Sequence, residues 1–252
     1  MIEILILSLV QGITEFLPVS SSSHLIIISE HINFKQQSLS IDVSLHIGSL
    51  LAVITYFNKD IFNLLENKDL LFKILISSVP VIIVGIILVK TNYIENLRNI
   101  KIIGWMTIVF GLVLYLSDKF KLKKNIKDHF SVKSAIIIGL FQILSLVPGV
   151  SRSGITITAG RFLNFTRYDA AKISFLLSVP ALGAVSIFGV KNILTTGDWN
   201  FSLLNFISIL FSFFFSFITI KFFLKYIEKF SLNVFVIYRI ILGIILLFFA
   251  YS

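Results

Sequence analysis

The 252-residue chain contains no cysteine, only four prolines and only 14% charged residues. The absence of cysteine excludes a disulfide framework, a cysteine-based zinc site and a thiol nucleophile. A soluble protein carries about 25% charged residues, so the shortage of charge argues against a soluble enzyme, a nucleic-acid module and a disordered chain. Hydrophobic residues make up 56% of the sequence, and the mean hydropathy is +0.95. The composition therefore predicts an integral membrane protein.

Six apolar stretches are long enough to cross a hydrocarbon core of about 30 Å. They cover residues 41–57, 70–89, 102–117, 171–190, 203–224 and 234–251. Two further segments, 2–28 and 135–163, are apolar but broken by polar residues beside Pro18 and Pro148. Broken backbone at membrane depth is tolerated only inside protein or beside a wet cavity. We therefore expect both segments to form re-entrant helical hairpins.

The order of segments indicates an inverted repeat, because each hairpin is followed by an odd number of spans. The hairpins also align at an offset of 131, which pairs Gln11 with Gln142 and residues 19–22 with residues 150–153. We expect one membrane domain over residues 1–252, with halves at about 1–117 and 134–252 and a Lys-rich cytoplasmic loop at 118–133. The predicted fold is an all-α polytopic membrane protein with six transmembrane helices and two re-entrant hairpins.

The formal charge of +9 supports one orientation in the membrane. If the loop at 118–133 is cytoplasmic, fifteen Lys and Arg residues lie in loops on that side and five lie on the other. This asymmetry is typical of cytoplasmic loops, so the positive charge does not indicate nucleic-acid binding. The first hairpin is then expected to open to the extracytoplasmic side. The start Met1-Ile2-Glu3 lacks the basic residues of a signal peptide, so we expect the first apolar segment to remain in the mature protein.

Ionisable groups at the two breaks are the candidate functional residues, since charge inside a bilayer is costly. Gln11 and Glu15 are four residues apart on one helix face, where their oxygens can converge on one hard cation or one water. Hydroxyl residues 20–23 follow Pro18, and such residues at a helix start favour an anion. Arg152 adds a planar fork that matches phosphate oxygens. A structural ion pair between Glu15 and Arg152 is the alternative.

Other polar residues in the apolar segments have two interpretations. Asp42 and His46 could support the site or cap the helix at the interface. Arg239 could bind phosphate, or its side chain could extend toward the cytoplasmic headgroups. His31 and His129 fall in loops and are expected to be inert.

The two breaks resemble the signature motifs of a known family. Residues 11–25, QGITEFLPVSSSSHL, and residues 148–157, PGVSRSGITI, closely resemble those of the bacterial undecaprenyl-diphosphate phosphatases, the bacitracin-resistance protein family. The resemblance extends over the whole chain, including residues 42–52 and the last apolar segment with Tyr238, Arg239 and Gly243. It implies hydrolysis of undecaprenyl diphosphate to undecaprenyl phosphate and inorganic phosphate, which recycles the lipid carrier of peptidoglycan synthesis in the bacterial plasma membrane and confers bacitracin resistance.

The resemblance also implies roles for individual residues. The catalytic positions are Glu15, Ser21, His24 and Arg152. A divalent cation, Ca²⁺ or Mg²⁺, is expected at Glu15 and Gln11. The diphosphate-binding positions are Ser20, Ser22, Ser151, Arg152, Ser153 and Thr156. Two departures bear on these roles: Gln11 stands where the family often has Glu, which suggests weaker metal binding, and Ser23 replaces a usual Gly before the histidine.

Several questions stay open at the sequence level. Ser21 could attack phosphorus after activation by Glu15 or His24, or Glu15 could activate a water directly; His24 could instead protonate the leaving group. A transporter or flippase for a polyprenyl phosphate or another anion is the alternative function, because inverted repeats with broken helices are typical of transporters. The expected partners are the lipid substrate and the bilayer, without nucleic acid, and a homo-oligomer stays open.

Overall fold

A computed structural model of the chain describes residues 1–21, 23–25, 28, 38–91, 97–120, 124–196 and 202–251. This part of the chain is built of helices and contains no strand. Six helices are long and apolar enough to cross a membrane. They are α3 (Leu39–Tyr56), α5 (Lys68–Lys90), α7 (Ile100–Asp118), α11 (Arg167–Thr196), α12 (Leu203–Lys229) and α13 (Asn233–Tyr251). The six predicted spans and the all-α class are confirmed.

Most of these helices begin before or end beyond the predicted apolar stretches, because polar residues cap them. The side chain of Ser38 accepts a hydrogen bond from the backbone N–H of Ile41 at the start of α3. The side chain of Asn67 accepts one from the backbone N–H of Leu70 at the start of α5. Such caps satisfy backbone donors that have no partner inside the helix, so the helix extends past its hydrophobic run.

The shorter helices include those of the two broken segments. The first contains α1 (Ile2–Thr14), and the second contains α9 (Val132–Ile143), the 3₁₀ turn η1 (Leu144–Leu146) and α10 (Arg152–Phe162). The breaks between helices lie where the sequence predicts them, and their entry into the bilayer stays a prediction. Two helices were not predicted, the amphipathic α4 (Asn58–Glu66) and the short α8 (Ile126–His129).

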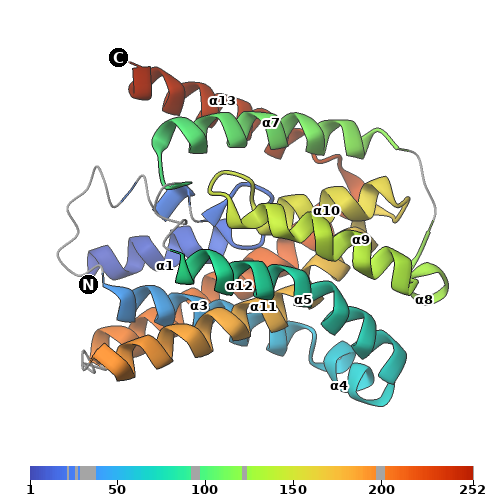
Figure 1. The fold of residues 1–252 in the computed structure, drawn as a ribbon, viewed down its shortest axis with the longest axis horizontal. Coiled ribbons are helices and arrows are strands. Elements are labelled where there is room, and N and C mark those ends of the chain that lie inside the picture. The colour runs from blue at the N-terminus through green and yellow to red at the C-terminus, as the bar shows by residue number, and fades with distance from the viewer. Residues whose placement is uncertain are drawn as a thin grey trace.

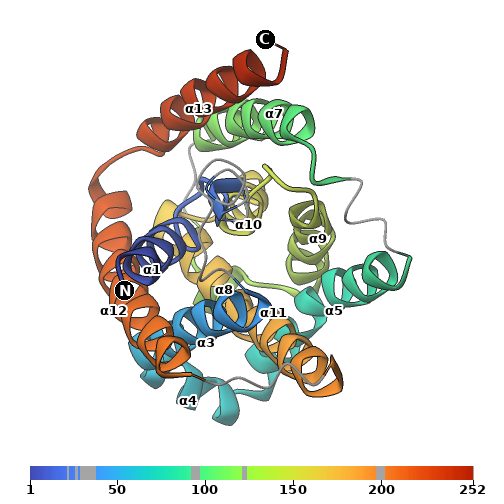
Figure 2. The same cartoon turned by 90° about the vertical axis from the view of Figure 1, so that its left-hand side faces the viewer.

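The helices surround α10, which lies near the centre of the molecule when it is viewed from one end (Figure 2). Helices α7 and α13 pack side by side along one face (Figure 1), and α10 contacts α7, α9 and α11. Helix α1 packs on α12, and α9 packs on α5. Gly12 and Gly139 permit these two approaches: an added Cβ would lie 2.6 Å from the Cβ of Phe215 and 2.5 Å from the carbonyl oxygen of Ser77, respectively. The inverted repeat itself remains a prediction.

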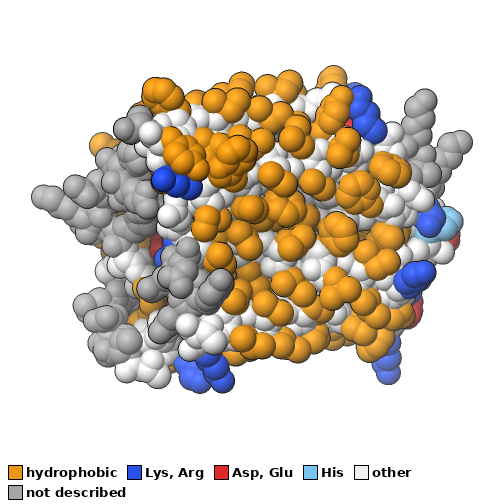
Figure 3. Space-filling view, turned by 45° about the horizontal axis from the view of Figure 1, so that its top comes forward, with side chains coloured by type: hydrophobic (Ala, Val, Ile, Leu, Met, Phe, Trp, Pro, Cys, Tyr) orange, Lys and Arg blue, Asp and Glu red, His pale blue; other side chains and the backbone are white. Residues whose placement is uncertain are grey.

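The outer surface is apolar around the middle of the molecule. Hydrophobic side chains cover the face in Figure 3, and the Lys and Arg side chains lie toward its ends. Large side chains such as Ile187 and Phe248 are 74% and 69% exposed. An apolar face of this kind would be unstable in water and is stable in lipid. The chain is therefore a multi-pass membrane protein.

Candidate active site

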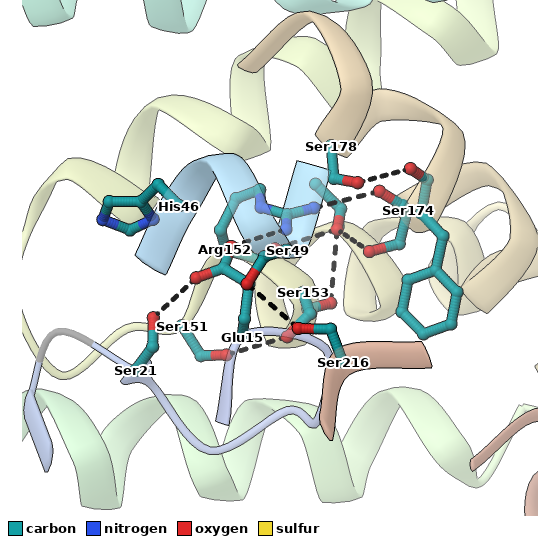
Figure 4. Close-up of polar contacts among 12 residues, drawn as sticks. Glu15, Ser21, His46, Ser49, Ser151, Arg152, Ser153, Ser174, Ser178 and Ser216 are labelled. Carbon is teal, nitrogen blue, oxygen red and sulfur yellow. Dashed lines mark hydrogen bonds and ion pairs between the residues drawn. The ribbon is translucent and has the colours of Figure 1, made fainter. Parts of the chain in front are cut away.

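The carboxylate of Glu15 is the meeting point of the two broken segments (Figure 4). Glu15 ends helix α1 and is only 7% exposed. Its Oε1 accepts a hydrogen bond from Nη2 of Arg152 at 2.8 Å. Its Oε2 accepts one from Nε2 of Gln11 and one from Oγ of Ser21, each at 2.9 Å. Of the expected site residues, the structure thus brings Gln11, Glu15, Ser21 and Arg152 together.

Arg152 connects this carboxylate to helix α11. Its Nη1 donates to the backbone oxygen of Ser174 at 3.1 Å, while Nη2 forms the ion pair with Glu15. Its side chain is 13% exposed, so most of the guanidinium is shielded from solvent. Breaking a shielded ion pair is costly, because the remaining charge stays buried. The direct ion pair between Glu15 and Arg152, which the sequence left as an alternative, is therefore present in the structure. A ligand that binds Arg152 has to replace or share this contact.

Local backbone geometry turns the chain at both breaks. Ser20 has φ +78° and Ser151 has φ +71°, a region that non-glycine residues rarely adopt. These two serines are 131 positions apart, the offset at which the broken segments align. Ser151 also caps α10, because its Oγ accepts a hydrogen bond from the backbone N–H of Gly154 at 3.1 Å. Strain at two equivalent positions beside a buried ion pair is typical of a functional site.

Two hydroxyls expected to bind diphosphate form hydrogen bonds between elements in this structure. Ser153 Oγ donates to the backbone oxygen of Leu17 at 2.7 Å, which ties α10 to the first break. Thr156 Oγ1 lies 2.7 Å from Oγ of Ser174 and ties α10 to α11. Ser22 lies outside the described residues. Diphosphate binding by these hydroxyls stays a prediction.

His24 faces helix α13 in this structure. Its Nδ1 lies 2.6 Å from the backbone oxygen of Ser20, so Nδ1 carries the proton and donates. Its Nε2 lies 2.5 Å from the hydroxyl of Tyr238, and the two rings are nearly parallel, with their centroids 5.8 Å apart. Nothing in the sequence pairs His24 with Tyr238, which is one of seven tyrosines in the chain. The group in contact with Ser21 Oγ is Glu15, not this imidazole.

Arg239 joins the two breaks through their backbone. The side chain is completely buried. Its Nη1 donates to the carbonyl oxygens of Pro18 at 3.2 Å and Val150 at 3.0 Å, and its Nη2 donates to that of Gly149 at 2.8 Å. Its Nε donates to the carbonyl oxygen of Thr107 at 3.1 Å on α7. The interpretation that this side chain extends toward the headgroups is wrong. Its guanidinium binds backbone carbonyl oxygens, which indicates a structural role.

A divalent cation fits the Glu15 site only in part. Glu15 is the single carboxylate beside Gln11, and the amide oxygen of Gln11 is buried without a hydrogen-bond partner. Within the described ranges, no three His, Asp or Glu side chains are grouped closely enough to hold a metal. Ca²⁺ needs six to eight oxygen ligands, whereas Mg²⁺ is often held by one or two carboxylates and substrate phosphates. The residues therefore suit a cation whose ligands are completed by a bound phosphate group.

Serines of α3, α11 and α12 lie near the site and were not predicted from the sequence. Ser174 contacts both Arg152 and Thr156. Ser49 Oγ on α3 lies 3.1 Å from Oγ of Ser212 and 3.0 Å from Oγ of Ser216 on α12. The available signal was spacing: Ser212 and Ser216 are four residues apart, so they share one face of an otherwise apolar helix.

Comparison with known proteins gives a family match over most of the chain. The family described as "Bacitracin resistance protein BacA" matches residues 4–245. A protein of Pelagibacter ubique named undecaprenyl-diphosphatase is 52% identical over 252 residues, covering 100% of this chain and 98% of the relative. Proteins of the same name from Jannaschia sp. and Hahella chejuensis are 39% and 40% identical, covering 98% and 99% of this chain and 97% and 98% of the relatives. The chain therefore belongs to the bacitracin resistance protein BacA family.

Proposed function

We propose that this protein hydrolyses undecaprenyl diphosphate to undecaprenyl phosphate and inorganic phosphate. The full-length relatives that carry the name undecaprenyl-diphosphatase support the substrate. The observation that carries the chemistry is the contact of one carboxylate, Glu15, with a hydroxyl, Ser21, and a guanidinium, Arg152. A hydroxyl beside a base and a phosphate-binding cation is the arrangement that phosphoryl transfer needs. In the bacterial plasma membrane this activity would recycle the peptidoglycan carrier and confer bacitracin resistance.

Ser21 is the nucleophile that the geometry favours. Its hydroxyl donates to Oε2 of Glu15, so the carboxylate can accept the proton as the serine oxygen attacks the terminal phosphorus. A new Ser21 O–P bond forms, the bridging P–O bond breaks, and its electron pair leaves with undecaprenyl phosphate. Glu15 releases the serine proton to solvent before the second half-reaction. Water then attacks the phosphorus and gives a proton to Glu15, the Ser21 O–P bond breaks, and Glu15 returns that proton to the serine oxygen as inorganic phosphate leaves. Direct attack by a water activated by Glu15 is the alternative path to the same products.

The remaining residues would bind and neutralise the diphosphate. Arg152 would move from Glu15 to the phosphate oxygens, where a planar fork binds two of them at once. A divalent cation, Ca²⁺ or Mg²⁺, held by Glu15 and Gln11 and by the substrate, would supply further neutralisation of the phosphate charge. His24, when protonated on both ring nitrogens, would protonate the leaving phosphate through Nε2, the nitrogen that contacts Tyr238. The predicted diphosphate ligands are Ser20, Ser22, Ser151, Ser153 and Thr156.

The test is phosphate release by the purified protein in detergent, with undecaprenyl diphosphate as substrate. We expect stoichiometric release of undecaprenyl phosphate and inorganic phosphate, reduced by a chelator and restored by Mg²⁺ or Ca²⁺. The same preparation in liposomes, assayed for movement of labelled undecaprenyl phosphate, separates hydrolysis from transport. If the protein moved the lipid but released no phosphate, its function would be transport and not hydrolysis.

A further inference from the structure

His46 contacts the proposed active site from a third element. It lies on α3, half-buried, and its Nδ1 is 3.1 Å from Nε2 of Gln11. Gln11 is completely buried, and the same Nε2 is 2.9 Å from Oε2 of Glu15. One amide nitrogen therefore joins the imidazole of His46 to the carboxylate of Glu15.

The charge on Glu15 fixes the direction of both hydrogen bonds. The ion pair with Arg152 favours the ionised carboxylate, whose oxygens can only accept. The Gln11 atom that faces Oε2 is therefore the amide nitrogen, which has two hydrogens. One hydrogen is donated to Glu15 and the other points to Nδ1 of His46, which must accept it.

The two acceptors together hold the amide of Gln11 in one orientation. The terminal torsion of a glutamine side chain is broad and is fixed mainly by its hydrogen-bond partners. Without the acceptor on His46, one amide hydrogen would be buried and unpaired, and rotation to find another partner would draw Nε2 away from Glu15. Glu15 Oε2 is also the atom that accepts from Ser21. The orientation of Gln11 thus decides which direction around Oε2 stays open for the serine proton.

We propose that His46 is a positioning residue: through Gln11 it aims Oε2 of Glu15 at the hydroxyl of Ser21. This inference rests on the proposed phosphatase function and adds to it a residue on α3 that acts without touching the substrate. Among the described residues, Asp42 on the same helix and Glu15 across the interface are ionisable side chains that interact with this imidazole.

Three variants test the role by phosphate release. His46→Leu removes the acceptor, and His46→Asn keeps an acceptor oxygen near the place of Nδ1. His129→Leu is the matched control, because His129 is an exposed residue of the short helix α8. We expect kcat to fall about 10-fold to 100-fold in His46→Leu with KM little changed, as for a small misplacement of a catalytic group. His46→Asn should recover most of kcat, and His129→Leu should match the wild-type protein.

A thermal-unfolding cycle with His46→Leu, Gln11→Leu and the double variant tests the contact without activity. We expect the Tm losses to be non-additive, since either single substitution already breaks the same hydrogen bond. A wild-type kcat in His46→Leu, an equal loss in His46→Asn and His46→Leu, or additive Tm losses would overturn the positioning role alone. Absence of phosphate release by the wild-type protein would instead overturn the proposed function, and the role of His46 with it.

Discussion

At the scale of single residues, the site depends on how three donors share one carboxylate. Glu15 accepts from Arg152 through Oε1, and from Gln11 and Ser21 through Oε2. Arg152 and Gln11 both stabilise the ionised form of Glu15, which is the form that can accept the proton of Ser21. Each donor comes from a different point of the chain, so a change at any one of them alters the basicity of the same oxygen atoms.

A change at Gln11 should alter the metal requirement. Gln11→Glu places a second carboxylate where an amide donor lies 2.9 Å from Oε2 of Glu15. Two carboxylates at that distance repel unless a proton or a cation lies between them. We expect the Mg²⁺ or Ca²⁺ concentration for half-maximal phosphate release to fall about tenfold, with lower activity in the presence of a chelator. An unchanged metal titration curve would show that this position takes no part in cation binding.

Much of the residue-level site could be predicted from the sequence. Glu15, Gln11, Ser21 and Arg152 stand out because polar groups are rare in segments this apolar. The role of Arg239 and the contact of His24 with the hydroxyl of Tyr238 could not be predicted, since both depend on which helix packs against which break. In the sequence, an arginine in an apolar segment fits both roles, a phosphate ligand and a residue that binds backbone carbonyl oxygens. The sequence alone therefore does not separate them.

At the scale of elements, the two breaks are held as one unit by side chains that reach across them. Ser153 of α10 donates to the first break at Leu17, and Arg239 of α13 donates to both breaks. The positions of these breaks could be predicted from Pro18 and Pro148. The positive φ angles of Ser20 and Ser151 could not, because serine has no intrinsic preference for that region.

Removing the guanidinium of Arg239 should loosen both breaks together. Arg239→Met keeps the length of the side chain but leaves the carbonyl oxygens of Pro18, Gly149 and Val150 without this donor. Each unpaired buried group costs about 1–3 kcal/mol, so we expect a Tm lower by at least several degrees in detergent, with phosphate release strongly reduced. The control is Arg98→Met at an exposed position. Equal melting temperatures for the two variants would contradict the role of Arg239 in holding the two breaks together.

At the scale of the whole molecule, a buried carboxylate joins the ends of three elements away from the site. Asp118 at the end of α7 accepts from Arg167 of α11, at 2.7 Å through Oδ1 and at 3.0 Å through Oδ2. Its Oδ2 also accepts from the backbone N–H of Leu232, next to the start of α13, at 3.1 Å. Burial and this number of donors give Asp118 a structural role.

Loss of Asp118 should therefore lower stability without changing the chemistry of the site. Asp118→Ala leaves both Arg167 and the buried Arg161, whose Nε lies 3.4 Å from Oδ1, without this partner, and breaking a buried pair costs about 3–5 kcal/mol. We expect a clearly lower Tm in detergent, with the metal dependence of phosphate release unchanged in the protein that stays folded. Glu66→Ala, which removes an exposed carboxylate at the end of α4, should leave Tm almost unchanged. Similar Tm values for both variants would contradict the structural role.

The orientation of the molecule in the membrane is testable because the natural chain has no cysteine. The excess of basic residues around the 118–133 loop predicts that Lys133 faces the cytoplasm and Lys191 the opposite side. In intact cells, a membrane-impermeant thiol reagent should label Lys191→Cys and should label Lys133→Cys only after lysis. The reverse pattern would overturn the expectation that the first hairpin opens to the extracytoplasmic side.

The most direct test of the central claim compares kcat/KM for phosphate release from undecaprenyl diphosphate among wild type, Glu15→Gln, Arg152→Gln and the double variant. Glu66→Gln, at an exposed carboxylate of α4, is the folded control. The Glu15–Arg152 contact predicts a loss of at least about 100-fold in each single variant, with little further loss in the double variant, because the two residues act as one unit. Wild-type rates in either single variant, with melting temperatures equal to that of the control, would contradict a site assembled from both broken helices.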